Sequence, residues 1–439
     1  MIFFYERIFC TRKVTQMTFS YNPLWNFLNK KNINKKQLKK ICSFSTSTIS
    51  RLCNNQNVGV ETLDRICQCF NCTMEDIVMH VEQEYSDIAL FNDTKYPLKT
   101  SLNTISLFSG AGGLDLGLIQ AGFNIVFAND IYKPAIENYA HNIGNISEAD
   151  IREINSKDLP DADVVVGGFP CQPFSNAGNR LGTDDDRGNL YLDVIRIIKE
   201  KKPKIVVMEN VRGLLSMKNK DGSKLIDTIT SLLESTSPGY KVNYRLLKAS
   251  DYGVPQHRFR VIIVGIRKDL GFTYQFPEPK EVDISKLTVG NIIKVPKETP
   301  NSEDIWPLSP QSQQLIEWIP EGGSWKNVPY EKLPDRLKKI RDDMKKYHSP
   351  NFYRRFGRNE INGTITAAAT PENSGILHPI ENRRYSVREI ARIQSFPDNY
   401  IFVGSSVSAK YKVIGNAVPP KLAKIIGDSI VKQLSEANY

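Results

Sequence analysis

The sequence lacks an apolar run long enough to cross a membrane. Its uninterrupted apolar stretches, such as residues 261–266, fall far short of the roughly 18 residues that a membrane-spanning helix needs. The apolar opening, residues 1–5, is followed at once by Glu6 and Arg7 without a small-residue cleavage site, so we expect no signal peptide. We therefore expect a soluble protein, for which Met17 is an equally good start.

Cysteine is scarce, with seven in the chain, six of them within the first 72 residues and Cys171 alone. An odd number without a secretory signal indicates a reducing compartment and free thiols. Cys67, Cys69 and Cys72 are spaced closely enough to suggest zinc, but a fourth ligand at a suitable spacing is missing and His80 is a poor candidate. We therefore expect no metal and interpret these three as small apolar side chains buried in helices.

The overall composition is that of an ordinary globular protein. Hydrophobic residues make up 40% of the chain and charged residues 24%, which excludes a disulfide-stapled miniprotein, a disordered chain and a collagen-like repeat. At roughly 100–200 residues per domain, the length of 439 residues predicts two to four domains.

The net charge of +10 is concentrated in two blocks. Residues 1–80 contain 11 basic and 5 acidic side chains, residues 326–358 contain 11 and 4, and the rest of the chain is slightly acidic. Two separate basic blocks favour two surfaces that face a polyanion. A generally solvated basic exterior is the alternative, and charge alone does not decide between them.

Residues 20–80 read as a run of short helices. Pro23 opens the first, residues 35–41 form the second, and residues 45–52 form a third whose hydroxyls suit an N-cap. A lysine-bearing helix, a tight turn and a Ser/Thr-rich helix resemble the phage-repressor type of helix-turn-helix. The resemblance implies DNA binding, and a purely structural helical module with a basic face is the alternative. The expected DNA contacts are Thr46, Ser47, Thr48 and Arg51.

Residues 81–100 read as a linker, after which apolar runs alternate with amphipathic helical stretches. This texture predicts an α/β domain with a mostly parallel sheet and helices on both faces. Ligands bind beyond the carboxyl ends of the strands in such sheets. The predicted strands are residues 105–108, 125–128, 164–166, 205–208 and 261–264, and polar or glycine-rich residues follow four of them.

A glycine-rich turn, FSGAGGLDLG at residues 108–117, follows the first predicted strand. Its glycines let a ligand approach the backbone. A dinucleotide-binding fingerprint would need glycine at Asp115, so a nicotinamide dehydrogenase is disfavoured. Asp130, at the end of the second strand, suits a pair of ribose hydroxyls, and Asp150 suits an adenine amine. Each alone is an ordinary turn residue, but together they favour an adenosine-containing cofactor.

A candidate nucleophile follows the third strand in the stretch GGFPCQPFS, residues 167–175. A lone cysteine is usually an inert buried side chain. Cys171, however, stands between two prolines at a strand end, where peptide N–H groups can lower the pKa of a thiol. Glu209 ends the neighbouring strand, so a nucleophile and an acid can face one substrate. The glycine-punctuated residues 176–188 suit a mobile lid.

The stretch QHRFR, residues 256–260, enters the last predicted strand. Alternation along a strand places Arg258 and Arg260 on one face. We expect this pair to bind the substrate beside Cys171, although a single arginine there would be read as a surface charge.

Two further motifs follow, RYSVREIARIQSFP at residues 384–397 and GNAVPP at residues 415–420. In the order of all these motifs, the chain resembles the DNA (cytosine-5) methyltransferases from about residue 104 to the end. The resemblance implies a Rossmann-like S-adenosylmethionine methyltransferase domain at 101–275, a small target-recognition domain at 276–407, and a segment at 408–439 that returns to the catalytic domain. The cofactor contacts that it implies are Phe108, Gly110, Gly112, Asp130, Asp150 and Asn416. Some relatives carry an aromatic residue at the position of Ile131, so adenine packing there is expected to be weaker.

The resemblance also implies a mechanism. Cys171 would add to C6 of a flipped cytosine, Glu209 would engage N3, and Arg258 would hold O2. Ser175 is the expected residue to enter the vacated space in the duplex. The expected DNA contacts in and near the recognition region are Gln256, Arg354, Arg355 and Arg358.

Two other functions remain open from the sequence. An RNA-directed enzyme of the same fold has similar catalytic motifs, and a DNA-binding regulator with an inactive catalytic body is the second alternative. The resemblance favours a bacterial, cytoplasmic restriction-modification methylase with a cognate restriction endonuclease, whose N-terminal domain represses its own gene. The target sequence is not readable, because loop geometry decides which base edge each side chain meets.

Overall fold

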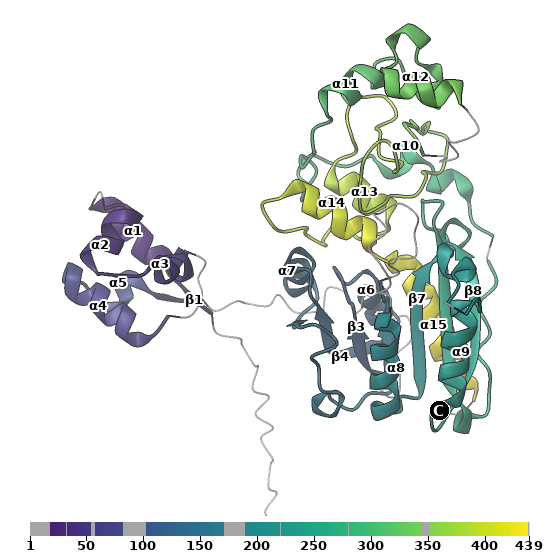
Figure 1. Cartoon of the computed structure of the whole chain (residues 1–439), viewed down its shortest axis with the longest axis horizontal. Helices are drawn as coiled ribbons and strands as arrows, with labels where there is room; N and C mark the ends of the chain where they lie inside the picture. The colour runs from purple at the N-terminus through teal and green to yellow at the C-terminus, as the bar shows by residue number, and fades with distance from the viewer. Residues whose placement is uncertain are drawn as a thin grey trace, which may run out of the picture. The chain divides into compact units, whose positions relative to one another are not determined.

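The computed structural model describes residues 18–31, 33–53, 58–81, 102–170, 189–219, 221–279, 281–343, 351–437 and 439. The chain divides into two compact units, Met1–Leu90 and Phe91–Tyr439 (Figure 1). Within the described residues, no helix is both long and apolar enough to span a membrane.

The N-terminal unit is a helical domain closed by a short strand pair. A buried apolar core that includes Leu24, Leu38, Leu52 and Ile66 joins its helices. The second and third helices lie where the sequence predicted them, and the strand pair was not predicted. The elements are β1 (Thr18–Ser20), α1 (Asn22–Lys30), α2 (Lys35–Ile41), α3 (Thr46–Cys53), α4 (Val60–Phe70), α5 (Met74–Ile77) and β2 (Met79–Val81), with β1 and β2 antiparallel.

Local hydrogen bonds explain the turn between α2 and α3. Asn34 and Gln37 form a capping box that starts α2. Ser43 takes a left-handed conformation (φ +54°), which turns the chain sharply. The backbone N–H of Thr48 then donates to Ser45 Oγ at 3.0 Å, which caps α3.

The larger unit is built on a seven-stranded sheet in the order β5-β4-β3-β6-β7-β9-β8. The five strands from β3 to β7 are parallel to one another, whereas β9 is antiparallel to both β7 and β8. The strands are β3 (Leu102–Leu107), β4 (Phe123–Asp130), β5 (Ser147–Glu148), β6 (Val164–Gly167), β7 (Ile205–Val211), β8 (Tyr240–Lys248) and β9 (Phe259–Arg267).

The direction of β9 decides where its first residues lie. Arg260 is paired with Val211, and Ile262 is paired with Glu209. The start of β9 therefore lies at the carboxyl end of β7. A fully parallel β9 would have placed the arginines at the opposite edge, so this antiparallel strand brings residues 256–260 to the edge where β3 to β7 end, called the carboxyl edge below.

Helices cover both faces of the sheet, which confirms the predicted α/β architecture (Figure 1). On one face, α6 and α15 pack against Val164 and Val166 of β6. On the other face, α8 and α9 pack against Val165 and Val206. The helices are α6 (Gly113–Gln120), α8 (Leu190–Lys201), α9 (Leu225–Ser235) and α15 (Pro420–Glu436), and α7 (Lys133–Asn142) follows β4.

Two glycines let the C-terminal helix pack tightly on α6. A Cβ at Gly113 would lie 2.3 Å from the carbonyl oxygen of Val418, and one at Gly117 would lie 2.3 Å from that of Pro420. Any larger residue would force the two helices apart.

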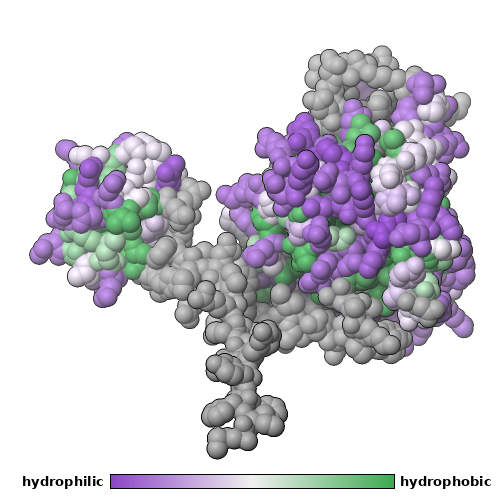
Figure 2. Space-filling model, turned by 90° about the horizontal axis from the view of Figure 1, so that it is seen from below, coloured by the Kyte–Doolittle hydropathy of each residue, from purple (hydrophilic) through white to green (hydrophobic). Residues whose placement is uncertain are grey.

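The chain beyond the sheet forms a smaller region with its own cores. One core surrounds Trp325 and Leu315, and another joins Tyr411 and Ile390 to Tyr139 of α7. Among the coloured residues of the larger unit in Figure 2, hydrophilic surface predominates, with hydrophobic areas between polar ones. The helices of this region are α10 (Val289–Ile292), α11 (Pro310–Ile316), α12 (Asp335–Asp342), α13 (Val387–Ile393) and α14 (Val407–Asn416).

Candidate active site

The glycine-rich turn leaves the sheet at its topological switch point, because β3 lies between β4 and β6. Phe108, Gly110 and Gly112 all have positive φ, at +54°, +59° and +71°. A Cβ at Gly112 would lie 2.0 Å from Ile143 Cδ1, whereas one at Gly110 would meet nothing within 4 Å. Gly112 therefore serves packing, and Gly110 leaves open space in which a ligand can approach the backbone.

Asp130 holds this turn in place. Its Oδ2 accepts a hydrogen bond from Gly110 N at 2.9 Å, and its Oδ1 accepts one from Tyr132 N at 2.8 Å. A carboxylate has about four acceptor sites, so each oxygen can still accept from a ligand hydroxyl. The neighbouring Ile131 is 65% exposed, which makes it an apolar surface beside these acceptors.

Asp150 and Asn416 reach the surface from two other elements. Asp150 follows β5 and accepts from Arg152 Nη2 at 2.6 Å and Nε at 3.0 Å. The hydrogen bonds from Arg152 lower the pKa of Asp150, so its carboxylate is an ionised acceptor. Asn416 is exposed at the last residue of α14.

Asp115 has a role that the sequence did not reveal. It is fully buried and accepts from Ser106 Oγ at 2.7 Å and from Tyr139 Oη at 2.8 Å. Burial raises the pKa of Asp115 to about 6, although both hydrogen bonds oppose this shift. The carboxyl group thus fastens α6 to β3 and α7 beneath the glycine turn. A lone acid inside the apolar segment GLDLGLIQ was the available signal.

Glu209 and Arg260 form a nearly buried ion pair at the carboxyl edge. Arg260 Nε lies 2.6 Å from Glu209 Oε1, and each side chain is 11% exposed. Burial lowers the pKa of Arg260, and the charge of Glu209 opposes that shift. A Cβ at Gly168 would lie 3.1 Å from Glu209 Oε2, so a glycine leaves this carboxylate open toward the end of β6.

Asn210 ties this pair to the segment that leads to the candidate nucleophile. Its Nδ2 donates to the carbonyl of Phe169 at 3.1 Å, and its Oδ1 accepts from Val211 N at 2.8 Å. Cys171 and Ser175 themselves, with the rest of residues 171–188, lie outside the described residues.

Arg258 differs from Arg260, and the expectation that it holds the base is corrected. It is fully buried, with Nη1 donating to the carbonyl of Ile365 at 2.7 Å and Nη2 donating to those of Gly415 at 2.7 Å and Ala417 at 3.1 Å. Strand alternation does not extend to Arg258, because β9 begins only at Phe259. Of the two arginines, Arg260 is the one paired with Glu209.

Two expected DNA contacts are also corrected, because both side chains are buried. Gln256 donates to Gln394 Oε1 and accepts from Ile365 N at 2.9 Å. Arg355 donates through Nη2 to the carbonyl of Ile316 at 2.8 Å and to Asn382 Oδ1 at 2.7 Å. Both side chains are occupied by contacts within the protein, so we do not assign either residue to DNA.

The other two arginines expected to contact DNA, Arg354 and Arg358, are paired with acids. Arg354 Nη2 lies 2.6 Å from Glu360 Oε1, and Arg358 Nε lies 3.0 Å from Glu321 Oε1. Arg358 is exposed and its pair is exchangeable with solvent or phosphate.

The expected DNA-binding residues of α3 all reach the surface at least in part. Thr46, Ser47 and Arg51 are exposed, and Thr48 is partly exposed. Lys39 of α2 donates to Thr46 Oγ1 at 2.7 Å, which links the two helices at this surface.

Cys67, Cys69 and Cys72 of the N-terminal unit were expected to be buried, and this expectation is only partly met. Cys69 is exposed, while Cys67 and Cys72 are partly buried, so only some of the cluster is packed inside. Burial raises the pKa of Cys72 to about 11. All three are free thiols.

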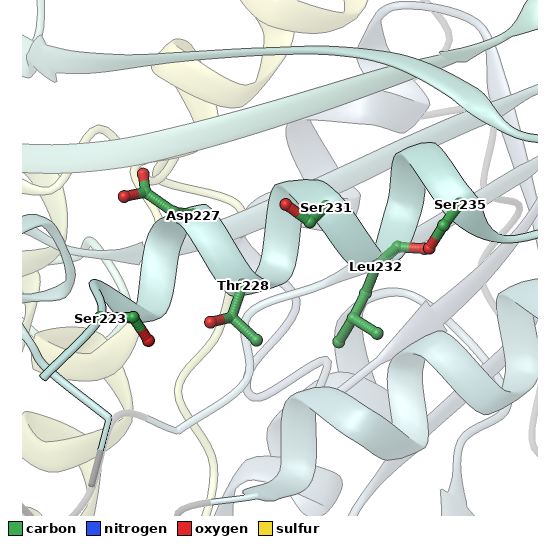
Figure 3. A pocket seen from close by; sticks show the side chains of 6 residues that line it. All are labelled: Ser223, Asp227, Thr228, Ser231, Leu232 and Ser235. Carbon is green, nitrogen blue, oxygen red and sulfur yellow. The ribbon is translucent and has the colours of Figure 1, made fainter. Parts of the chain in front are cut away.

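A shallow hollow on α9 is a less suitable site. Figure 3 shows its six side chains along one flank of the helix and the turn before it. They offer hydroxyl groups and one carboxylate, but none follows a strand of the sheet. The lining residues are Ser223, Asp227, Thr228, Ser231, Leu232 and Ser235.

Comparison with known proteins agrees with this geometry. Residues 102–432 match the C-5 cytosine-specific DNA methylase family, and residues 23–83 match the Cro/C1-type HTH DNA-binding domain. Type II methyltransferase M.NgoFVII of Neisseria gonorrhoeae is 40% identical over 345 residues, which cover 76% of this chain and 87% of that protein. Type II methyltransferase M.Sau96I of Staphylococcus aureus is 33% identical over 397 residues, covering 85% and 88%.

A solved structure supports the fold as well. A prophage-encoded E. coli protein, solved as a candidate DNA modification methyltransferase, superposes with a TM-score of 0.55 at 25% identity and covers 76% of this chain and 100% of that one. The family match spans most of the chain. The chain therefore belongs to the C-5 cytosine-specific DNA methylase family and is a DNA cytosine-5 methyltransferase with an N-terminal Cro/C1-type helix-turn-helix domain.

Proposed function

We propose that the protein methylates C5 of a flipped cytosine, within one target sequence, as the methylase of a type II restriction-modification system. The observation that carries this proposal is the Glu209–Arg260 pair, which lies beside the end of β6. β6 ends at Gly167, four residues before Cys171. Named relatives such as M.NgoFVII are type II methyltransferases, which supports the restriction-modification role and a cognate endonuclease for the same site.

The open glycine turn fits S-adenosylmethionine as the methyl donor. Gly110 leaves free space above the backbone, and Asp130 and Asp150 present acceptors at the ends of neighbouring strands. When bound, S-adenosylmethionine supplies an electron-poor methyl group on a sulfonium. The residues proposed to hold it are Phe108, Gly110, Gly112, Asp130, Ile131, Asp150 and Asn416.

Cytosine needs covalent activation, because its C5 is a weak nucleophile. The Cys171 thiolate adds to C6, and the new C–S bond places electron density on C5. Glu209 engages N3, and Arg260 takes the place first given to Arg258 by donating to O2. C5 gains its methyl group with S-adenosylhomocysteine as the leaving group. Water then takes the C5 proton, the C–H electron pair re-forms the C5–C6 double bond, and the C–S bond breaks to restore the thiolate.

The base must leave the duplex before Cys171 can reach it. Flipping costs a few kcal/mol, which contacts from residues 172–188 must recover. Ser175 is the proposed residue in the vacated space. Arg354 and Arg358 are proposed to contact DNA from the recognition region by exchanging their carboxylate partners for phosphate.

The N-terminal domain is proposed to bind an operator and to repress its own gene. Exposed Thr46, Ser47 and Arg51 on α3 support this role. Arg51→Ala should weaken binding to DNA from upstream of the gene at least about tenfold in a gel-shift titration. Arg65→Ala, an exposed arginine on α4, is the matched control and should bind as the wild type does. Equal affinity of Arg51→Ala and the wild type would contradict the role of α3.

Covalent trapping tests the catalytic proposal. Duplex DNA with 5-fluorocytosine in the target site cannot lose a C5 proton, so the Cys171 adduct should persist and be visible by denaturing electrophoresis. Wild-type protein should form it only with S-adenosylmethionine present, and Cys171→Ala should form none. An adduct of equal yield in Cys171→Ala would remove Cys171 from the mechanism.

A further inference from the structure

Arg258 closes the C-terminal end of α14. Its Nη2 donates to the carbonyls of Gly415 and Ala417, and the chain between them contains a single residue, Asn416. The last carbonyls of a helix carry partial negative charge, which stabilises a cation buried there. Nε has no hydrogen-bond partner among the described residues, so the carbonyl contacts through Nη1 and Nη2 determine where the guanidinium lies.

The same helix end is held from other sides. Gln394 Nε2 donates to the carbonyl of Ala417 at 2.6 Å and to that of Ile414 at 3.2 Å. A Cβ at Gly415 would lie 2.4 Å from the backbone of Thr366, so the turn also fits closely against the recognition region. Asn416 alone points outward from this packed turn and is exposed.

The backbone of Arg258 leads directly to the base site. Its carbonyl accepts from Ala249 N at 2.8 Å, which fixes the chain as it enters β9. Two residues later, Arg260 pairs with Glu209. One buried residue therefore contacts the turn around Asn416 through its side chain and is continuous with the base site through its backbone.

We propose that Arg258 is a positioning residue that couples the cofactor site to the base site. Its guanidinium sets the position of Asn416, and its main chain sets that of Arg260. This inference rests on the proposed function, because Asn416 and Arg260 take their roles from it. A lysine could keep the charge but not the planar fork that bridges three carbonyls, so Arg258→Lys should release the turn.

The test compares Arg258→Lys with Arg355→Lys. Arg355 is also a buried arginine held by backbone carbonyls, but its partners, Ile316, Ile380 and Asn382, are not among those that hold Arg258. We expect Arg258→Lys to weaken binding of S-adenosylhomocysteine, measured by calorimetry without DNA, about tenfold and to lower kcat by about tenfold or more. Arg355→Lys should keep wild-type affinity for S-adenosylhomocysteine.

A double-mutant cycle separates coupling from general loss of structure. Asn416→Ala should weaken S-adenosylhomocysteine binding in the wild type but add little in Arg258→Lys, because the contact is already misplaced. Additive effects would overturn the inference. So would a lowered kcat with unchanged S-adenosylhomocysteine affinity, because that result would mean that Arg258 acts on the base and not on the cofactor site.

A second variant covers the case in which Arg258→Lys does not fold. Gln394→Met removes the other side-chain donor to the Ala417 carbonyl and should show the same non-additivity with Asn416→Ala; additivity there would overturn the inference. Failure of the proposed function can be told apart from failure of this inference. Wild-type protein that binds S-adenosylhomocysteine but does not methylate DNA would contradict the proposed function. The double-mutant cycle on S-adenosylhomocysteine binding would still measure the coupling.

Discussion

At the scale of single residues, two carboxyl groups at the carboxyl edge have opposite environments. Glu209 is paired with a guanidinium, whereas Asp115 is held by two hydroxyl groups beneath the glycine turn. Glu209 is the residue proposed to engage the base. Asp115 joins three elements and carries a burial cost whenever it is ionised.

Asp115 should make stability depend on pH. Its folded pKa of about 6 exceeds the ordinary value of 3.8, so its contribution is fully present below pH 3.8 and is lost as pH rises through 6. The total loss by pH 7.5 should be about 3 kcal/mol, of which about 1.4 kcal/mol falls between pH 5 and 7.5. Asp115→Asn should abolish this dependence, measured as the difference in free energy of unfolding between pH 5 and 7.5 by urea titration. An unchanged difference would contradict the raised pKa.

Arg260 should be needed for the reaction itself. Removing a donor that stabilises charge in the reacting base costs about 100-fold or more in kcat, so Arg260→Leu should lose at least that much. Arg267 provides the control, because it lies at the other end of β9 and pairs with Asp269. Arg267→Leu should keep kcat within experimental error. Comparable losses in both variants would indicate a general effect on β9.

The backbone conformation of a motif residue could be predicted where the local sequence determines it. Its side-chain partners could not be predicted where they come from distant parts of the chain. The positive φ of Gly110 and Gly112 follows from their place in a strand-to-helix turn. The hydrogen bonds of Gln256 and Arg258 do not, because their partners Gln394, Ile365 and Gly415 lie more than 100 residues away. The resemblance implied that residues 408–439 return to the catalytic domain, but not which side chains would meet or be buried there.

At the scale of elements, the decisive feature is the antiparallel β9. The spacing of apolar runs predicted its existence, but an apolar run does not reveal its direction. The short connection from β8 to β9 allows the antiparallel pair, and the register of Arg260 with Val211 places the start of β9 at the carboxyl edge. β5 has only two residues, too few for any periodicity to show.

The contact between α6 and α15 should be sensitive to one methyl group. Gly117→Ala would place a Cβ 2.3 Å from the carbonyl oxygen of Pro420, so the helices must separate. We expect a loss of about 1–3 kcal/mol in the free energy of unfolding. Gly213→Ala is the control, because its Cβ would make only an ordinary contact at 3.8 Å. Equal stability of the two variants in urea titration would contradict the tight packing.

At the scale of the whole molecule, the structure refines the meaning of the net charge of +10. Exposed Arg51 on α3 agrees with a basic surface on the N-terminal unit. In the second block, Arg355 is buried, and Arg354 and Arg358 are paired with Glu360 and Glu321. Part of that block is therefore used in contacts within the protein, and its charge excess overstates the surface that is free to meet DNA.

The central claim is methyl transfer to C5 of cytosine through Cys171, and the most direct measurement is bisulfite sequencing of DNA from a host that expresses the chain. The proposed mechanism predicts 5-methylcytosine at one recurrent sequence in cells with the wild-type protein and none in cells with Cys171→Ala at equal protein level. Absence of methylation with folded wild-type protein, or equal methylation with Cys171→Ala, would contradict it.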